Sequence, residues 1–150
     1  MERSIQKLNK FRAFALQIAR LSQCKRHKVG CIIIDPWFEG VHALGYNGPA
    51  RGINNNACTG KIGQCGCAHA EVNALVKLRK RGCVLITTVS PCLACANLIL
   101  NSGAIIAVVY MANYRNLDGL DLLRRGGIIC KYEVTDADIR KWRTLSSTSK

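Results

Sequence analysis

The chain has 150 residues, of which 49% are hydrophobic, and it carries a formal net charge of +13. This length suits a single domain, residues 1–150, with a substantial core, and no apolar run approaches the ~20 residues that a membrane span needs. The basic excess favours anionic partners, whether nucleotides, nucleic acid or other phosphate groups. The basic N-terminus lacks the apolar stretch of a signal peptide, so we expect a cytoplasmic protein.

The first half of the chain predicts one helix and a pair of strands. Apolar residues recur at helical spacing from Ile5 onward, which predicts an amphipathic helix reaching about Cys24. The β-branched run 29–35 predicts a buried strand, and 41–46 predicts a second strand antiparallel to it. Residues 47–67 are rich in Gly, Asn and Cys, and a loop of this length in a compact domain is usually functional or tied down.

The second half alternates between helix and strand patterns. Helices are expected at 68–80, from Pro91 to Gly103, at 117–125 and from Asp136 to Trp142, and strands at 83–89, 105–111 and 128–134. Pro91 suits a first helical position, and Asp136 is a suitable N-cap. In the helix 68–80, Val72, Leu75 and Val76 are expected to face inward. Strand–helix–strand connections require parallel pairing, so the prediction is a three-layer α/β/α domain with a mixed five-stranded sheet.

Nine cysteines in a chain of this size need an explanation. Cys31, Cys83 and Cys130 lie in or beside apolar runs and are expected to be small buried hydrophobes. The remaining six fall mostly in Cys-x-Cys and Cys-x-x-Cys pairs. In a reducing compartment such pairs more often mark metal ligands than disulfides.

Two segments together predict a metal site. His69 begins one predicted helix, and Cys92 and Cys95 begin the next. Helices that follow adjacent parallel strands begin at the same edge of the sheet, where open α/β sheets bind ligands. One histidine and two cysteines suit a catalytic zinc that keeps its fourth position for water, and Glu71 lies close enough to move protons. The alternative is a closed zinc site that only joins loops, with Glu71 as an ordinary first-turn acid.

The sequence also resembles the zinc-dependent cytidine deaminase superfamily, and within it the deoxycytidylate (dCMP) deaminases. The resemblance covers residues 24–134 and is carried by "HKVGCIIID", "GYNG", "HAEVNAL", "TTVSPCLACANLILNSGAIIAVVY" and "DLLRRGGI". His-x-Glu with Pro-Cys-x-x-Cys is a zinc-deaminase signature. The resemblance implies a cytidine-deaminase-like fold and an enzyme that hydrolyses dCMP to dUMP and ammonia for thymidylate synthesis. Zinc-bound hydroxide would attack C4, and Glu71 would shuttle protons.

The resemblance also assigns substrate contacts. It implies that Val29 packs on the pyrimidine, that the Ala70 N–H binds the base carbonyl, and that the Ser90 carbonyl holds the amino group. It implies that Asn47 binds the deoxyribose hydroxyl, although Asn-Gly is also a common turn. Tyr114 is expected either to border the nucleotide or to be an exposed loop residue.

A 5′-phosphate requires cationic partners, and two arginines are our candidates. Arg26 precedes the first strand and Arg115 follows Tyr114. A guanidinium can bind phosphate through two hydrogen bonds. Solvated surface charge remains the alternative for each of them.

Four cysteines, namely Cys24, Cys58, Cys65 and Cys67, remain for a second site. Some members of the resembled family carry a structural zinc bound by this region, and four thiolates satisfy a closed tetrahedral site. The alternative is unpaired loop thiols. On this interpretation the stretch 63–71 contributes to two metal sites: His69 faces the first, and Cys65 and Cys67 face the second.

The resemblance has consequences beyond the site. It implies a homo-oligomer, a hexamer in the family, with dCTP and dTTP as allosteric effectors. Here Pro49 follows "GYNG" directly, without the intervening small residue that is usual. The sequence therefore does not decide whether this chain keeps regulation by dCTP and dTTP. A deaminase acting on dCTP or on nucleic acid remains the rival interpretation, because the net charge of +13 also fits a phosphate backbone.

Overall fold

Five strands form one mixed sheet in the order β2-β1-β3-β4-β5 in the computed structural model, which describes residues 2–149. β1 (Gly30–Ile34) pairs antiparallel with β2 (Val41–Tyr46) and with β3 (Cys83–Thr87). β4 (Ile105–Tyr110) and β5 (Ile129–Lys131) continue the sheet parallel to β3. The predicted mixed five-stranded sheet is therefore confirmed.

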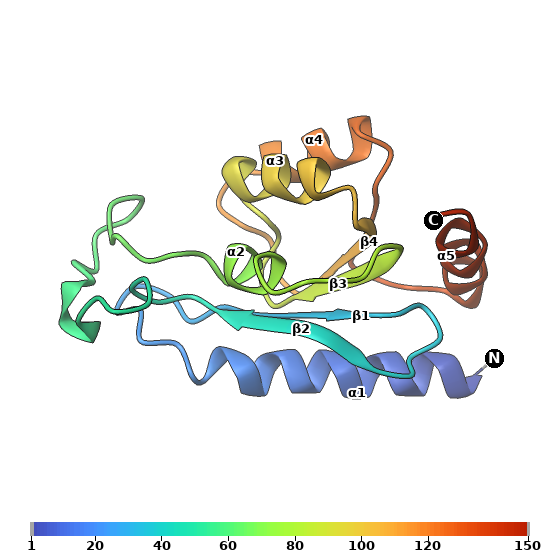
Figure 1. Cartoon of the computed structure of the whole chain (residues 1–150), viewed down its shortest axis with the longest axis horizontal. Helices are drawn as coiled ribbons and strands as arrows, with labels where there is room; N and C mark the ends of the chain where they lie inside the picture. Colours follow the sequence, from blue (N-terminus) through green and yellow to red (C-terminus); the bar gives the residue numbers. More distant parts are fainter. Residues whose placement is uncertain (1, 150) are drawn as a thin grey trace.

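Helices cover both faces of this sheet (Figure 1). α1 (Glu2–Ala19) and α5 (Asp136–Thr148) pack on one face, in a cluster that includes Leu8, Ile86 and Trp142. α2 (Ala70–Leu75), α3 (Leu93–Ser102) and α4 (Asp118–Arg125) pack on the other face, in a cluster that includes Leu85, Ile99 and Leu120. All five residues of β1 and of β3 are buried, because strands covered on both faces exclude water from every side chain.

The first helix is shorter than its periodicity predicts. α1 ends at Ala19, and the N–H groups of Arg20, Leu21 and Ser22 bond to carbonyls three residues earlier instead of four. The chain then turns away, because Ser22 bonds to Asn47 and Cys24 joins a group of cysteines. The prediction of a helix through Cys24 is wrong for this tertiary reason.

α2 is also shorter than predicted, spanning Ala70–Leu75 instead of 68–80. Its buried residues are Ala70, Glu71 and Ala74, and Val76, which the periodicity places on the inner face, is 65% exposed. The helix lies so close to β2 that a β-carbon on Gly45 would come within 2.3 Å of the Ala70 carbonyl oxygen. Small residues on both sides permit this approach, which places the start of α2 firmly on the sheet.

Helix ends differ from the predictions at two further points. The N-cap of α5 is Thr135, which forms a capping box with Asp138, so the prediction of Asp136 as the cap is wrong. The helix continues to Thr148, past the predicted end at Trp142. α3 begins at Leu93 with Cys92 as its N-cap, two residues later than expected.

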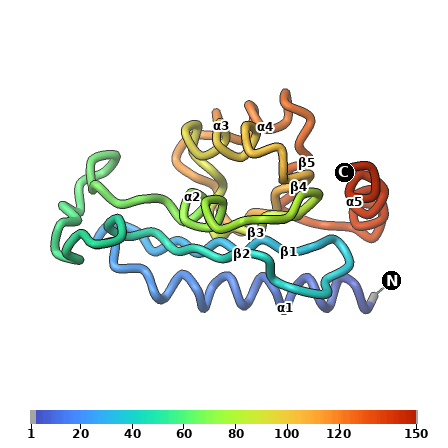
Figure 2. The backbone as a smooth tube through the Cα atoms, viewed as in Figure 1, coloured from blue at the N-terminus to red at the C-terminus, as the bar shows by residue number. Residues whose placement is uncertain are grey.

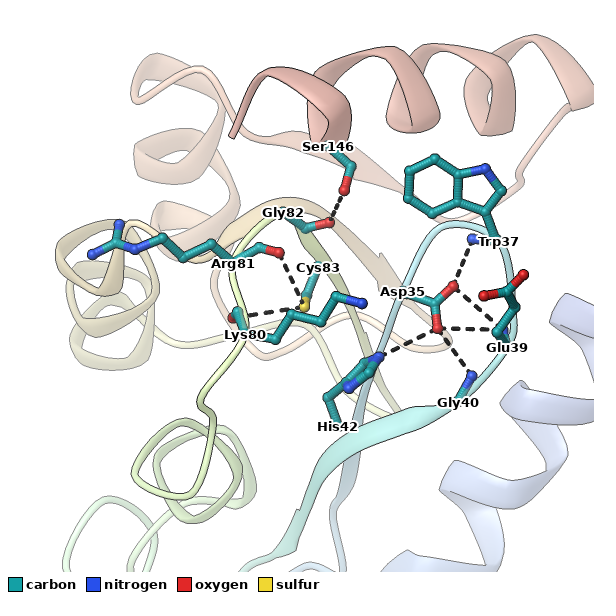
Figure 3. A network of polar contacts seen from close by, with 10 residues as sticks. All are labelled: Asp35, Trp37, Glu39, Gly40, His42, Lys80, Arg81, Gly82, Cys83 and Ser146. Carbon is teal, nitrogen blue, oxygen red and sulfur yellow. Dashed lines mark hydrogen bonds and ion pairs between the residues drawn. The ribbon is translucent and has the colours of Figure 1, made fainter. Parts of the chain in front are cut away.

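The turn between β1 and β2 is organised by the buried carboxylate of Asp35 (Figure 3). It accepts N–H groups of Trp37 at 2.9 Å, Glu39 at 3.2 Å and Gly40 at 2.9 Å, and it lies 3.3 Å from Nε2 of His42. Burial alone would raise the pKa of Asp35, but these hydrogen bonds outweigh it and hold the pKa below its usual value. The carboxylate therefore stabilises this turn in its charged form.

The segment between β2 and α2 extends at the end of the molecule away from α5 and the two termini (Figure 2). Its one helical element is the short 3-10 helix Asn55–Ala57, capped by the Asn54 side chain. Gly48 and Ala68 exchange two backbone hydrogen bonds of 3.1 and 2.8 Å and close the segment at its base. This bridge brings the segment's two ends together beside the start of α2.

Candidate functional site

Two helix starts meet at one edge of the sheet. β2 and β3 both run antiparallel to β1, so they point in the same direction, and the chain leaves both at the same edge. The prediction that these strands are adjacent is wrong, because β1 lies between them. The predicted meeting of the two helix starts still occurs, since α2 and α3 begin side by side.

His69, Cys92 and Cys95 converge at this edge, as predicted. His69 is the N-cap of α2, Cys92 is the N-cap of α3, and Cys95 lies in the first turn of α3. His69 Nδ1 lies 3.4 Å from Cys92 Sγ and 3.3 Å from Cys95 Sγ. The hydrogen bond from Cys95 lowers the pKa of Cys92 to about 4, which favours the thiolate form that binds a metal.

These three side chains fit zinc. A nitrogen and a sulfur on one tetrahedral zinc are separated by about 3.6 Å, given bond lengths of about 2.1 and 2.3 Å. The two nitrogen–sulfur distances are within a few tenths of an ångström of this value. Three protein donors leave one position of a tetrahedron free, which is the arrangement of catalytic zinc sites.

Glu71 lies beside the three donors at the bottom of a cavity. Its side chain is buried, with the residue only 4% exposed, and Cys95 Sγ lies 3.6 Å from its Oε2. Burial raises the pKa of Glu71 above that of an ordinary carboxyl group. A carboxyl group in this position faces the cavity and not bulk water, so it can exchange protons with a bound ligand.

The cavity has a volume of about 220 Å³ and opens to the solvent. All seven predicted substrate residues line it: Arg26, Val29, Asn47, Ala70, Ser90, Tyr114 and Arg115. His27, Val89 and Asn113 also line it and were not predicted. Each is next to or near a predicted residue in the sequence, which is the one signal that could have pointed to them.

Asn47 is a buried part of the wall and not the centre of a plain turn. Its side-chain amide donates to the His27 carbonyl at 2.6 Å and accepts the Val29 N–H at 2.8 Å. Asn47 thus holds the segment that leads into β1 against the cavity.

The rim of the cavity is cationic. The Arg115 guanidinium lies 5.1 Å from the centre of the Tyr114 ring, a cation–π contact, and Arg26 lines the same wall. Tyr114 is held by its N–H, which donates to the Ser90 hydroxyl at 2.7 Å. A second hollow of about 510 Å³ adjoins the first, and both arginines line it as well.

Cys24, Cys58, Cys65 and Cys67 form a second group, with all four sulfurs within 4.8 Å of one another. The sulfurs of Cys24 and Cys58 are 3.8 Å apart, which matches the ~3.8 Å between two sulfurs on one tetrahedral zinc. The Lys25 N–H lowers the pKa of Cys58 to about 7, which favours a thiolate. The four thiols therefore also fit a metal, although this group offers no open position.

The described residues 2–149 contain no helix that is both long and apolar enough to cross a bilayer. Within the same range, the nine cysteines are all free thiols.

Comparison with known proteins now identifies the family. A family model for the cytidine and deoxycytidylate deaminase zinc-binding region matches residues 5–112. The chain belongs to this family. The matched region of this deaminase family includes His69, Glu71, Cys92 and Cys95, and its zinc-binding character agrees with the geometry of these donors.

Individual relatives agree with the family assignment. The deoxycytidylate deaminase of Schizosaccharomyces pombe is 33% identical over 136 residues, covering 79% of this chain and 41% of the relative. The deoxycytidylate deaminase of Mycobacterium phage D29 is 34% identical over 118 residues, covering 67% of this chain and 90% of the relative. The chain thus spans about two fifths of the yeast relative and most of the phage one.

One solved structure confirms the cytidine-deaminase-like fold. The dCMP deaminase of the cyanophage S-TIM5, solved in complex with dCMP and dUMP, is similar with a TM-score of 0.74 and 33% identity. The match covers 82% of this chain and 93% of the phage chain. The resemblance inferred from the sequence motifs is therefore confirmed at the level of both family and fold.

Proposed function

We propose that this chain catalyses the hydrolytic deamination of dCMP to dUMP and ammonia. The observation that carries the proposal is the convergence of His69, Cys92 and Cys95 beside the buried carboxyl group of Glu71, at the bottom of a cavity. The relative with dCMP and dUMP bound, at 33% identity, supports a pyrimidine nucleotide as the ligand of this cavity.

Zinc would be held by His69, Cys92 and Cys95. When bound, zinc supplies a Lewis acid that makes water a nucleophile at neutral pH. The chain's own residues provide binding and proton transfer. Glu71 faces the cavity and is the group that takes a proton from the nucleophile and delivers protons to the base and the leaving amine.

The walls of the cavity orient the base and the sugar. Val29 offers an apolar surface to one face of the pyrimidine, the Ala70 N–H donates to its carbonyl oxygen, and the Ser90 carbonyl accepts from its amino group. Asn47 contacts the deoxyribose hydroxyl. All four residues line the cavity, which supports this orientation of the nucleotide.

The phosphate of the nucleotide lies at the cationic rim. Arg115 and Arg26 are the two guanidinium groups that line the cavity, and each can bind phosphate oxygens through two hydrogen bonds. The stacking of Arg115 on Tyr114 restrains its side chain, so less conformational freedom is lost when phosphate binds.

A deamination panel tests this proposal. The purified protein is incubated with dCMP, dCTP, CMP, deoxycytidine and a cytosine oligonucleotide, with and without added dCTP or dTTP as effectors. We expect dCMP to give the highest kcat/KM, with product formation followed by the change in ultraviolet absorbance. No turnover of any nucleotide would overturn the proposal.

A second candidate function is deamination of dCTP or of nucleic acid. The second hollow favours it, because this hollow continues from the cationic rim and is large enough for further phosphates or a neighbouring nucleotide. Turnover of the oligonucleotide but not of dCMP would establish the nucleic-acid alternative, and a preference for dCTP over dCMP would establish the nucleotide one.

We also propose that this chain forms a homo-oligomer. Exposed apolar side chains on the edge strand β2 and at the end of α2, namely Val41, Tyr46 and Val76, support association with further copies of this chain. Light scattering measures the number of subunits, for which the family implies six. The four-thiol group requires reduced cysteines, which supports a cytoplasmic location.

A further inference from the structure

The hydroxyl group of Ser22 joins the end of α1 to the wall of the cavity. Ser22 is 2% exposed and lies just after the last turn of α1. Its Oγ lies 2.6 Å from Oδ1 and 2.7 Å from the carbonyl oxygen of Asn47. The Cys24 N–H donates to the same Oγ at 3.1 Å.

These contacts make the Ser22 hydroxyl a hydrogen-bond donor to Asn47. The Cys24 N–H is a donor and occupies a lone pair on Oγ, so the hydroxyl must use its own hydrogen elsewhere. The two oxygens within reach both belong to Asn47. Ser22 therefore donates to Asn47, and burial protects this bond from competition by water.

The same contacts fix the orientation of the Asn47 amide. Its oxygen accepts the Val29 N–H and lies 2.6 Å from the Ser22 hydroxyl, while its nitrogen donates to the His27 carbonyl. Turning the amide over would place its nitrogen against the Val29 N–H and its oxygen against the His27 carbonyl. One N–H of Nδ2 is used by His27, so the other is the donor that Asn47 has for a ligand in the cavity.

We propose that Ser22 is a positioning residue, which holds the Asn47 amide so that its free N–H donates to the 3′-hydroxyl oxygen of the bound deoxynucleotide. This inference rests on the proposed function. It adds a residue that lies outside the cavity lining and acts only through Asn47. Ser22 has no part in the chemical step, because the reacting groups lie on α2 and α3.

The test compares Ser22→Ala with wild-type protein on two substrates, dCMP and 2′,3′-dideoxy-CMP, which lacks the 3′-hydroxyl. Loss of one hydrogen bond to Asn47 should raise KM for dCMP about three- to tenfold and leave kcat within about twofold. KM for the dideoxy substrate should not change, because the contact that Ser22 supports is absent. Ser22→Thr keeps the hydroxyl and should restore the wild-type KM.

Ser102→Ala is the matched control. The Ser102 hydroxyl donates to the Ile99 carbonyl at 2.6 Å and accepts the Ala104 N–H at 3.2 Å, the same pattern at a helix end far from the cavity. This variant should lose stability to a similar extent but keep its KM for both substrates. If Ser22→Ala folds poorly, as judged by thermal melting, Ser22→Gly makes the same comparison.

Equal effects of Ser22→Ala on the two substrates, or a loss confined to kcat, would overturn the inference. Calorimetric binding of dUMP and 2′,3′-dideoxy-UMP measures the same contact without turnover. A wild-type preference for dUMP that Ser22→Ala abolishes supports the positioning role even if dCMP is not turned over, which would overturn the proposed function alone. Failure of the wild-type protein to bind either nucleotide would overturn both.

Discussion

Gly119, in the first turn of α4, lies directly against the backbone of Pro91. A β-carbon at position 119 would come within 2.1 Å of the Pro91 carbonyl oxygen and 2.8 Å of the Cys92 carbonyl carbon. Because Cys92 is a candidate zinc ligand, α4 packs directly against the backbone that carries one donor of the candidate metal site. Although α4 contributes no candidate ligand itself, this contact allows it to influence where the candidate ligand Cys92 lies.

Gly119→Ala should therefore disturb both stability and metal binding. Overpacking against backbone typically costs about 1–3 kcal/mol, because neither side can rotate away. We expect a lower melting temperature and less bound zinc per chain, measured by calorimetry and by metal analysis. Gly40→Ala is the control, since a β-carbon there meets nothing within 4 Å. Wild-type zinc content in Gly119→Ala would contradict the prediction.

Glu71→Gln should separate proton transfer from metal binding. Glutamine keeps the shape of the side chain but cannot carry a proton between the nucleophile and the leaving amine, so kcat should fall about 10²- to 10⁴-fold. Zinc content should stay at the wild-type level, because Glu71 is not among the three donors. Glu39→Gln, on the exposed turn after β1, should leave kcat unchanged. Residual activity within tenfold of wild type would show that another group moves the protons.

The four-cysteine group should bind a second zinc. We expect wild-type protein to contain about two zinc ions per chain and Cys65→Ser/Cys67→Ser to contain about one. The double variant should have a clearly lower melting temperature but a small loss of kcat, because these cysteines secure a loop and, although they line the cavity wall, are not among the three donors beside Glu71. Cys130→Ala, in the core beneath α4, should keep both ions. A single zinc in the wild-type protein would refute the second site.

Asp35→Asn should make the free energy of unfolding less dependent on pH in the acidic range. The folded-state pKa of Asp35 lies below its usual value, so the charged carboxylate stabilises the fold above the unfolded-state pKa, and this contribution is lost as the pH falls through the folded-state pKa. Hydrogen bonds to a charged group are worth about 1.5–3 kcal/mol each when lost, which sets the expected scale at neutral pH.

Urea unfolding at several pH values measures this difference. The gap in the free energy of unfolding between wild type and Asp35→Asn should be largest near neutral pH and should shrink on acidification. Glu39→Gln is the control, because Glu39 is an exposed carboxylate of the same turn and bonds to Asp35 through its backbone N–H. A gap that is constant with pH would show that the carboxylate is not the source of the stabilisation.

The sequence was sufficient to predict the layers of the fold and the convergence of three candidate metal donors. His69 and the pair Cys92 and Cys95 could be found because the ends of strands with a common direction must meet at one edge. His27 and Asn113 also line the cavity, but their residue types do not separate them from ordinary loop residues, so their adjacency to predicted residues is the one signal for them.

Other features depended on tertiary contacts that no local pattern contains. The end of α1 at Ala19 follows from the bond between Ser22 and Asn47, which lie 25 residues apart. The late start of α2 at Ala70 follows from the bridge between Gly48 and Ala68. The position of β1 between β2 and β3 is likewise not specified by the sequence, because hydrophobic periodicity does not determine which strands pair.

The long segment between β2 and α2 is anchored at separate points and not along its length. Cys58, Cys65 and Cys67 hold its second half, and Gly48 closes its base, whereas residues 50–57 are all exposed. Because the entropic cost of closing a loop rises only slowly with its length, added residues between two such anchors change the free energy of folding little. The stretch 50–57 is therefore where we expect this chain to accept added residues, such as a peptide tag, without movement of either group of candidate metal donors.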